Sequence, residues 1–166
     1  MLRPAWLLWL FTLGAIPLLS CSGRPLQEWF LGHIGQNGVV LLLAVSLLGF
    51  GCLVVRYFVS NGEGIKPRYL LCSIPLLIVI ALTTQSMVEL SHIMVFGLFG
   101  FLTLRLFSLP LAIVLCLMVA GLDELLQYYL PSRVGDWQDV LLNLLSTGLG
   151  GMWAFFLHRD QQGRAG

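Results

Sequence analysis

The sequence predicts an all-α membrane protein, a polytopic bundle of about six transmembrane helices, from its composition and from the lengths of its apolar runs. Of the 166 residues, 58% are hydrophobic and 10% are charged, and the mean hydropathy is +0.90. Soluble domains carry about 25% charged residues, and a chain this short exposes too much surface to dissolve with so few charges. Lipid is therefore expected to cover most of the protein. Because the net charge is +1, a broad basic face is excluded, and nucleic acid is not expected as a partner.

Six apolar runs follow one another along the chain, and segments rich in glycine or proline separate several of them. The runs cover residues 5–22, 38–55, 69–87, 90–104, 109–129 and 140–157. A spanning helix needs about 20 residues, with a range of about 17 to 25. The run at 90–104 is shorter than this range, so it is either a tilted partner of the preceding run or a short helix in a thinned region of the bilayer. Helix breaks are expected at residues 22–25, 61–64, 108–110 and 131–132.

The first run has more than one interpretation. Arg3, the apolar stretch after it and the sequence Leu-Leu-Ser-Cys at residues 18–21 resemble a bacterial lipoprotein signal, in which Cys21 is lipidated after cleavage. An ordinary cleaved signal peptide is the second interpretation. The five hydrophobic runs that follow favour the third and simplest one, a first helix that is retained. The sequence leaves the choice between cleavage and retention of residues 1–21 open.

The four cysteines give no sign of a disulfide framework or of a zinc site. They are Cys21, Cys52, Cys72 and Cys116, and no two of them form a CxxC pair. Cys52, Cys72 and Cys116 lie in the second, third and fifth apolar runs, where a cysteine is expected to act as a small buried hydrophobic side chain.

The distribution of lysine and arginine predicts that both termini are cytoplasmic. If all six runs span and the N-terminus is inside, seven of the nine basic residues lie inside, and Arg24 and Arg133 lie outside. Short cytoplasmic loops of membrane proteins carry such an excess. We therefore expect a multi-pass protein of the bacterial inner (plasma) membrane. Its predicted parts are two helices with a basic loop (1–68), a four-helix membrane domain (69–158) and a cytoplasmic tail (159–166).

In this orientation, polar side chains gather at the outer end of the later helices. The spacing of three residues between Glu124 and Gln127 places both on one helix face, and the same holds for Glu89 and His92. The predicted ligand-binding set is Glu89, His92, Glu124, Gln127, Arg133, Asp136, Asp139 and Asn143. Taken one by one, the loop aspartates could be solvated or cap the last helix, and His92 could form an interfacial hydrogen bond. Their convergence at one depth favours a site.

Within this set, Glu124 is predicted to be the most informative residue. An acidic group costs about 2.5–3.5 kcal/mol at the bilayer centre, so it must be protonated, paired or in a wet cavity. The candidate partners of Glu124 are Arg133 and His92. Asp123 points about 100° away from Glu124 on a helix, so the two cannot face one site equally.

Small residues in the later runs predict close contact between helices. Gly97 and Gly100 occur in the fourth run, and Thr147, Gly150 and Gly151 occur in the sixth. Such residues let helix backbones approach one another within a membrane.

Two segments resemble the signatures of the VanZ-like family, a group of membrane proteins related to a teicoplanin-resistance protein. Residues 89–100 (ELSHIMVFGLFG) are similar to the first signature, an acidic or basic residue, two residues, histidine and an aromatic residue. The second signature consists of Glu-x-x-Gln followed along the chain by an arginine, two spaced aspartates, an asparagine and a glycine. It is carried here by Glu124, Gln127, Arg133, Asp136, Asp139, Asn143 and Gly148 or Gly150. The resemblance covers roughly residues 69–157 and implies a membrane location linked to the cell envelope, with no particular reaction.

The chain departs from this family pattern at two places. Many members have a lysine before the histidine, where this chain has Glu89 and Leu90, and many have a tyrosine at the position of Phe96. A role that needs this cation or this hydroxyl group is therefore not carried over.

Three functions fit the sequence, and it leaves the cofactors and the oligomeric state open. The first is binding of a lipid-linked saccharide or glycopeptide-like ligand, in contact with membrane lipids and with other envelope proteins. The second is a membrane enzyme acting on envelope lipid intermediates, with Glu124 and His92 as acid and base or with a divalent metal. The candidate metal ligands are Asp123, Asp136 and Asp139, with Glu124 beside them. The third is a small proton-coupled transporter, which is disfavoured because the polar residues do not cross the membrane.

Overall fold

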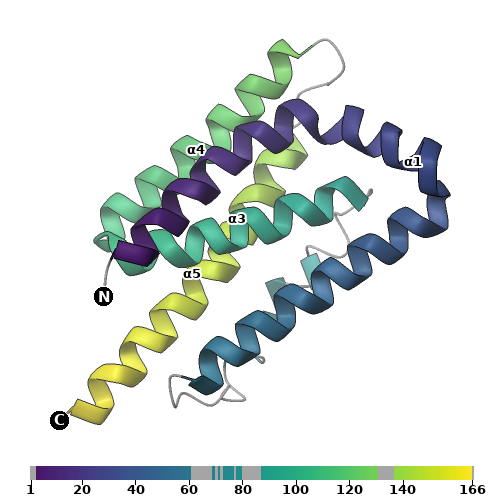
Figure 1. Ribbon diagram of the computed structural model, residues 1–166. Helices are drawn as coiled ribbons and strands as arrows, with labels where there is room; N and C mark the ends of the chain where they lie inside the picture. Colours follow the sequence, from purple (N-terminus) through teal and green to yellow (C-terminus); the bar gives the residue numbers. More distant parts are fainter. Residues whose placement is uncertain are drawn as a thin grey trace.

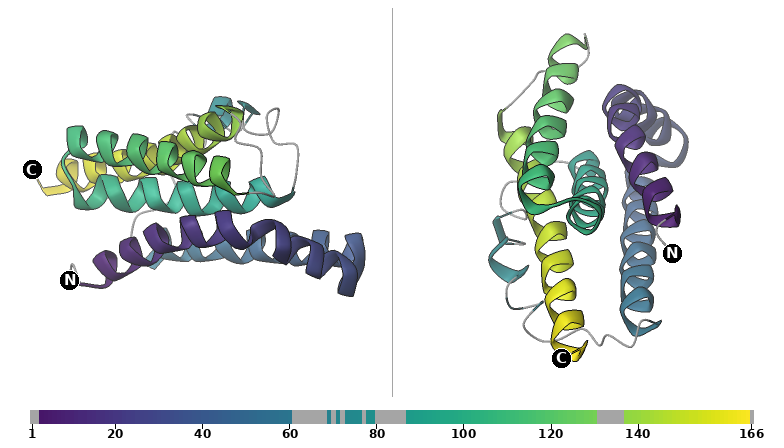
Figure 2. Two further views of the ribbon diagram at one scale, coloured as in Figure 1. Left: turned by 90° about the horizontal axis from the view of Figure 1, so that it is seen from above. Right: turned by 90° about the vertical axis from the view of Figure 1, so that its left-hand side faces the viewer.

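The structure, a computed structural model, describes residues 3–60, 69, 71, 73–76, 78–79, 87–130 and 137–165. Throughout these residues the regular structure is α-helical and no strand occurs, which confirms the predicted all-α class. The helices are α1 (Arg3–Ser60), α3 (Met87–Leu106), α4 (Leu109–Tyr129) and α5 (Trp137–Ala165), as labelled in Figure 1. Figure 2 shows α3 between α1 on one side and α4 with α5 on the other.

The N-terminal helix turns at a place that the sequence did not predict. The break expected at residues 22–25 is absent, and α1 continues through Pro17 and Pro25. The chain turns instead at Gly35, whose φ of 66° lies in the region that glycine adopts without strain. Proline is tolerated inside membrane helices because neighbouring groups satisfy the freed carbonyl. Two helical segments therefore follow one another in α1, and Figure 1 shows the second running back along the bundle.

Three helical segments within the described residues are long and apolar enough to cross a membrane. They are Pro4–Val39, Leu109–Tyr129 and Trp137–Arg159. Ser91–Leu106 is apolar but shorter, as the sequence predicted for the fourth run. The predicted run at 69–87 falls mainly outside the described residues, so the count of six spans and the cytoplasmic termini stay predictions.

The helix α4 has two distinct faces. Its buried residues follow one another at spacings of three or four, which places them on a single stripe: Ala112, Cys116, Ala120, Asp123 and Gln127. The opposite face exposes large apolar side chains, including Leu117, Met118, Leu122 and Leu125. A helix with this pattern in a membrane protein packs its small and polar stripe against other helices and turns its large apolar residues toward lipid.

The apolar core joins the first half of α1 to α3 and α4. Trp9 stacks on Phe99, with ring centroids 5.9 Å apart. Its indole Nε1 donates a hydrogen bond to Thr103 Oγ1 at 2.9 Å, and the Thr103 hydroxyl donates to the carbonyl of Phe99 at 2.6 Å. Ile16, Phe96 and Ala120 continue this buried cluster. The indole N–H and the threonine hydroxyl thus satisfy each other inside the core.

The backbones of α3 and α5 approach closely because glycines form the contact. A Cβ atom placed on Gly150 would lie 1.8 Å from the carbonyl oxygen of Gly97. A Cβ atom placed on Gly100 would lie 2.2 Å from the carbonyl oxygen of Thr147. Both distances are far below van der Waals contact, so no side chain fits at either glycine unless the backbones separate. The close packing predicted from these glycines is confirmed.

We predict that Gly150→Ala destabilises the protein, because its methyl group forces α5 away from Gly97. The expected loss in the free energy of unfolding is about 1–3 kcal/mol, the usual range for overpacking. The measurement is a titration of the purified protein from mild into denaturing detergent. Gly148→Ala is the matched control, because no atom lies within 4 Å of a Cβ atom at this exposed position. Equal unfolding curves for the two variants would contradict the prediction.

Candidate functional site

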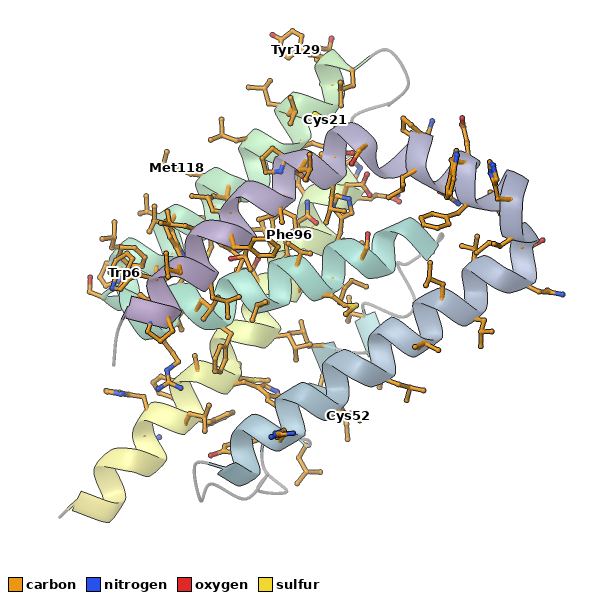
Figure 3. The ribbon with its side chains drawn as sticks, viewed as in Figure 1. Trp6, Cys21, Cys52, Phe96, Met118 and Tyr129 are labelled. Carbon is orange, nitrogen blue, oxygen red and sulfur yellow. The ribbon has the colours of Figure 1, made fainter. Side chains whose placement is uncertain are left out.

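The carboxylate of Asp123 is the centre of a buried polar cluster to which all four labelled helices contribute. Its position on the buried stripe of α4 leaves Asp123 3% exposed. The other members are Ser20 from α1, His92 from α3, Gln127 from α4 and Asn143 from α5, and each of these side chains is buried. We call these five residues the Asp123 network. Figure 3 shows Met118 and Tyr129 pointing outward from α4, whereas Phe96 lies among the helices.

Three donors reach the two oxygens of this carboxylate. Gln127 Nε2 donates to Asp123 Oδ2 at 3.0 Å, one helical turn further along α4. Asn143 Nδ2 donates to the same oxygen at 3.3 Å, and Ser20 Oγ donates to Oδ1. A buried carboxylate is costly unless hydrogen-bond donors replace the water that it has lost. The sequence supplies these donors from three different helices.

His92 faces the same carboxylate without forming a direct hydrogen bond to it. Its Nδ1 atom lies 3.8 Å from Asp123 Oδ2, which is beyond hydrogen-bond distance but close enough for electrostatic interaction. The imidazole is nearly parallel to the ring of Phe96, one turn later on α3, with centroids 6.2 Å apart. Its Nε2 atom is buried as well. The imidazole therefore neighbours both the ring of Phe96 and the carboxylate of Asp123.

The structure puts Asp123, rather than its neighbour Glu124, at the centre. Glu124 is half-buried, and its Oε2 atom is shielded from solvent. Adjacent residues of a helix point about 100° apart, so the packing of the whole helix decides which of them faces inward. The small residues Ala112, Cys116 and Ala120 mark the packed face, and Asp123 continues their spacing. This stripe is the sequence signal that distinguishes the two carboxylates.

Ser20 is a member of the network that the sequence analysis missed. It lies in the first apolar run, which was assigned no part in the site. The signal that could have found it is a helical stripe in that run. Trp9, Thr12, Ile16 and Ser20 recur at spacings of three, four and four residues, and all four are buried.

The remaining predicted residues are placed as follows. Glu89 lies in the first turn of α3, but its side chain is outside the described residues. Asp139 is half-buried in the first turn of α5, and Arg133 and Asp136 are outside the described residues. No group of three or more histidine, cysteine, aspartate or glutamate side chains suited to a metal ion occurs within the part that the structure describes. The network partners of Asp123 include two amides and a hydroxyl group, and these act as donors to it.

The network lies a short distance inside one end of the bundle. Asp123 precedes Tyr129, the last residue of α4, by six residues, which is about 9 Å along a helix. Asn143 follows Trp137, the first residue of α5, by the same number. Tyr128, Tyr129 and Trp137 are exposed, and exposed tyrosine and tryptophan are typical of the boundary between membrane and water. This end is where Figure 3 places Tyr129.

A family model described as VanZ/LLP1 matches residues 39–158, which is more than half of the chain. The match begins in the second segment of α1, earlier than the resemblance noted from residue 69. It contains His92, Asp123, Gln127 and Asn143, but not Ser20. Searches of curated proteins and of solved structures returned no significant match to this chain. Together with its long apolar helices, the match shows that the chain belongs to the VanZ/LLP1 family and is a membrane protein.

Proposed function

We propose that this protein belongs to the cell envelope and binds a lipid-linked saccharide or a glycopeptide-like ligand near the outer face of the inner membrane. One observation carries the proposal: the carboxylate of Asp123 is buried between apolar helices and receives donors from α1, α4 and α5. Ionisable residues inside membrane proteins are costly and usually mark a ligand, ion or proton site. The Asp123 network is the group of described residues that fits this rule.

The proposed orientation rests on the positions of the basic residues. Arg105 lies in the last turn of α3 and Arg159 near the end of α5, at the ends of these helices that are remote from the Asp123 network. In Figure 1 the start of α1 and the end of α5 lie on the same side of the bundle. With this side in the cytoplasm and all six predicted runs spanning the membrane, seven of the nine basic residues would be inside, in agreement with the positive-inside rule. The network then faces the extracytoplasmic side.

The chemistry of the network and its rim suits a saccharide ligand. Carboxylates and side-chain amides bind the hydroxyl and acetamido groups of sugars, and Arg133, which follows α4 in the sequence, suits a phosphate or carboxylate. Because the network itself is buried, the ligand contacts its rim. Glu124 and Asp139, both half-buried, are the rim carboxylates. The hydrogen bonds of Asp123 hold α1, α4 and α5 in register, and this fixes the positions of the two rim carboxylates.

The first test is binding of an isoprenoid pyrophosphate-linked saccharide to the protein in lipid nanodiscs, measured by native mass spectrometry. We expect Glu124→Gln to weaken binding about 10- to 150-fold, because a hydrogen bond to a charged group is worth about 1.5–3 kcal/mol. Asp123→Asn is expected to have an effect of similar size, because the network loses its charged acceptor. Asp160→Asn, near the end of α5, is the control and should bind as the unchanged protein does. Equal affinities for all these variants would refute the site.

The second test concerns the link to glycopeptides. Expression of the protein in a glycopeptide-susceptible bacterium is expected to raise the inhibitory concentration of the drug. Arg133→Ala should abolish this increase while the protein still accumulates in the membrane, because the arginine would contact an anionic group of the ligand. Susceptibility that is unchanged by expression of the protein, by its deletion and by this variant would count against an envelope function.

An enzyme acting on the same lipid intermediates is the second candidate, and the position of His92 favours it. An imidazole whose Nδ1 faces a carboxylate at 3.8 Å resembles an acid–base group that a carboxylate orients. We expect His92→Gln to lower turnover of an isoprenoid pyrophosphate-linked saccharide by about 10²–10⁴-fold, with its binding preserved. The assay follows product masses and phosphate release, with and without Mg²⁺. Absence of turnover in the unchanged protein under both conditions would leave binding as the function.

A further inference from the structure

We propose that Ser20 is a positioning residue of the Asp123 network, and that the first half of α1 therefore remains in the mature protein as one side of this site. Ser20 is 1% exposed and donates to Asp123 Oδ1, although 103 residues separate the two in the chain. The inference rests on the same site as the proposed function, but it does not depend on the identity of the ligand.

The positioning role follows from the way in which the two carboxylate oxygens are used. Gln127 and Asn143 donate to Oδ2, and His92 lies nearest to that same oxygen. Ser20 donates to Oδ1. A hydrogen bond on each oxygen fixes the rotation of the carboxylate about its χ2 angle, a torsion that is otherwise broad. Ser20 thus holds Oδ2 toward the donors of α4 and α5 and toward the imidazole.

The segment that carries Ser20 is packed along its length. Trp9 hydrogen-bonds to Thr103 and stacks on Phe99, and its ring centroid lies 5.2 Å from that of Phe107. Ile16 belongs to the same buried cluster. These contacts link the first half of α1 to α3 in the same way as the contacts inside a folded domain, by burial of aromatic rings and satisfaction of polar groups.

Retention of this segment is the alternative to the lipoprotein-type signal at residues 18–21. Cleavage before Cys21 would detach Ser20 from Asp123 and Trp9 from Phe99, whereas Cys21 itself is exposed and contributes nothing to the network. It would leave Oδ1 without its serine donor inside the bundle, a state that proteins avoid. The structure therefore assigns residues 9–20 to the working protein.

The first experiment is the intact mass of the protein, purified from a bacterial membrane through a C-terminal tag. The expected mass includes residues 1–20, apart from removal of the initiator methionine. A chain that begins at Cys21, with or without an attached lipid, would overturn the inference, and so would any cleavage after Trp9 within this segment.

The second experiment tests positioning by NMR of ¹⁵N-labelled histidine in nanodiscs. The three histidines are His33, His92 and His158, and His92→Gln identifies the signals of His92. Ser20→Ala is expected to shift the ring nitrogens of His92 but not those of the other two, because the released carboxylate rotates. Ser20→Thr, which restores a hydroxyl group, should move them back toward their original positions.

Ser22→Ala is the matched control, because the Ser22 hydroxyl donates to the carbonyl of Leu18 at 2.6 Å and does not belong to the Asp123 network. If Ser20→Ala does not fold, Ser20→Cys gives the same comparison, since it keeps the side-chain size with a weaker donor. Unshifted His92 signals in a folded Ser20 variant would overturn the positioning role. A failure of saccharide binding with these shifts present would refute the proposed function alone.

Discussion

The need to solvate one buried carboxylate constrains the whole bundle. An acidic group between apolar helices is tolerated when protein donors replace the water that it has lost. Asp123 obtains such donors from Ser20, Gln127 and Asn143. Two of these come from other helices, so each of those helices must lie at one particular height and rotation. Within a membrane, where apolar contact with a helix differs little from contact with lipid, such a polar cluster specifies the arrangement more sharply than apolar packing does.

The glycines between α3 and α5 help to place one of these donors, Asn143, beside Asp123. The contacts of Gly150 with Gly97, and of Gly100 with Thr147, bring the two backbones together. Asn143 lies one turn before Thr147 on α5, on the buried face, and donates to Asp123 across the helix boundary. A bulky residue at these glycines would push α5 away from α3 and so displace Asn143, whose hydrogen bond to Asp123 is 3.3 Å long. Close packing and the polar network are therefore two parts of one arrangement.

Much of this architecture can be predicted from the sequence, because hydropathy and helical spacing are local properties. His92, Gln127 and Asn143 could be selected because they interrupt apolar helices near one end. The choice between Asp123 and Glu124 was harder, since neighbouring residues differ in direction and only the packing of the whole helix decides which faces inward. The turn at Gly35 was missed because Pro25 is a stronger local signal, yet a membrane helix can accommodate proline. Ser20 was missed because its partner lies 103 residues away.

The two oxygens of the Asp123 carboxylate accept hydrogen bonds from different parts of the chain, and this links those parts to each other. Oδ2 is held by Gln127 and Asn143, which lie inside the segment that matches the family, whereas Oδ1 is held by Ser20, which precedes that segment. A rigid carboxylate cannot rotate at one oxygen without moving the other. A displacement of Ser20 that preserves its hydrogen bond to Oδ1 would therefore also move Oδ2, the oxygen nearest to His92. The segment before the family domain is in this way linked, through the Asp123 carboxylate, to the neighbourhood of His92.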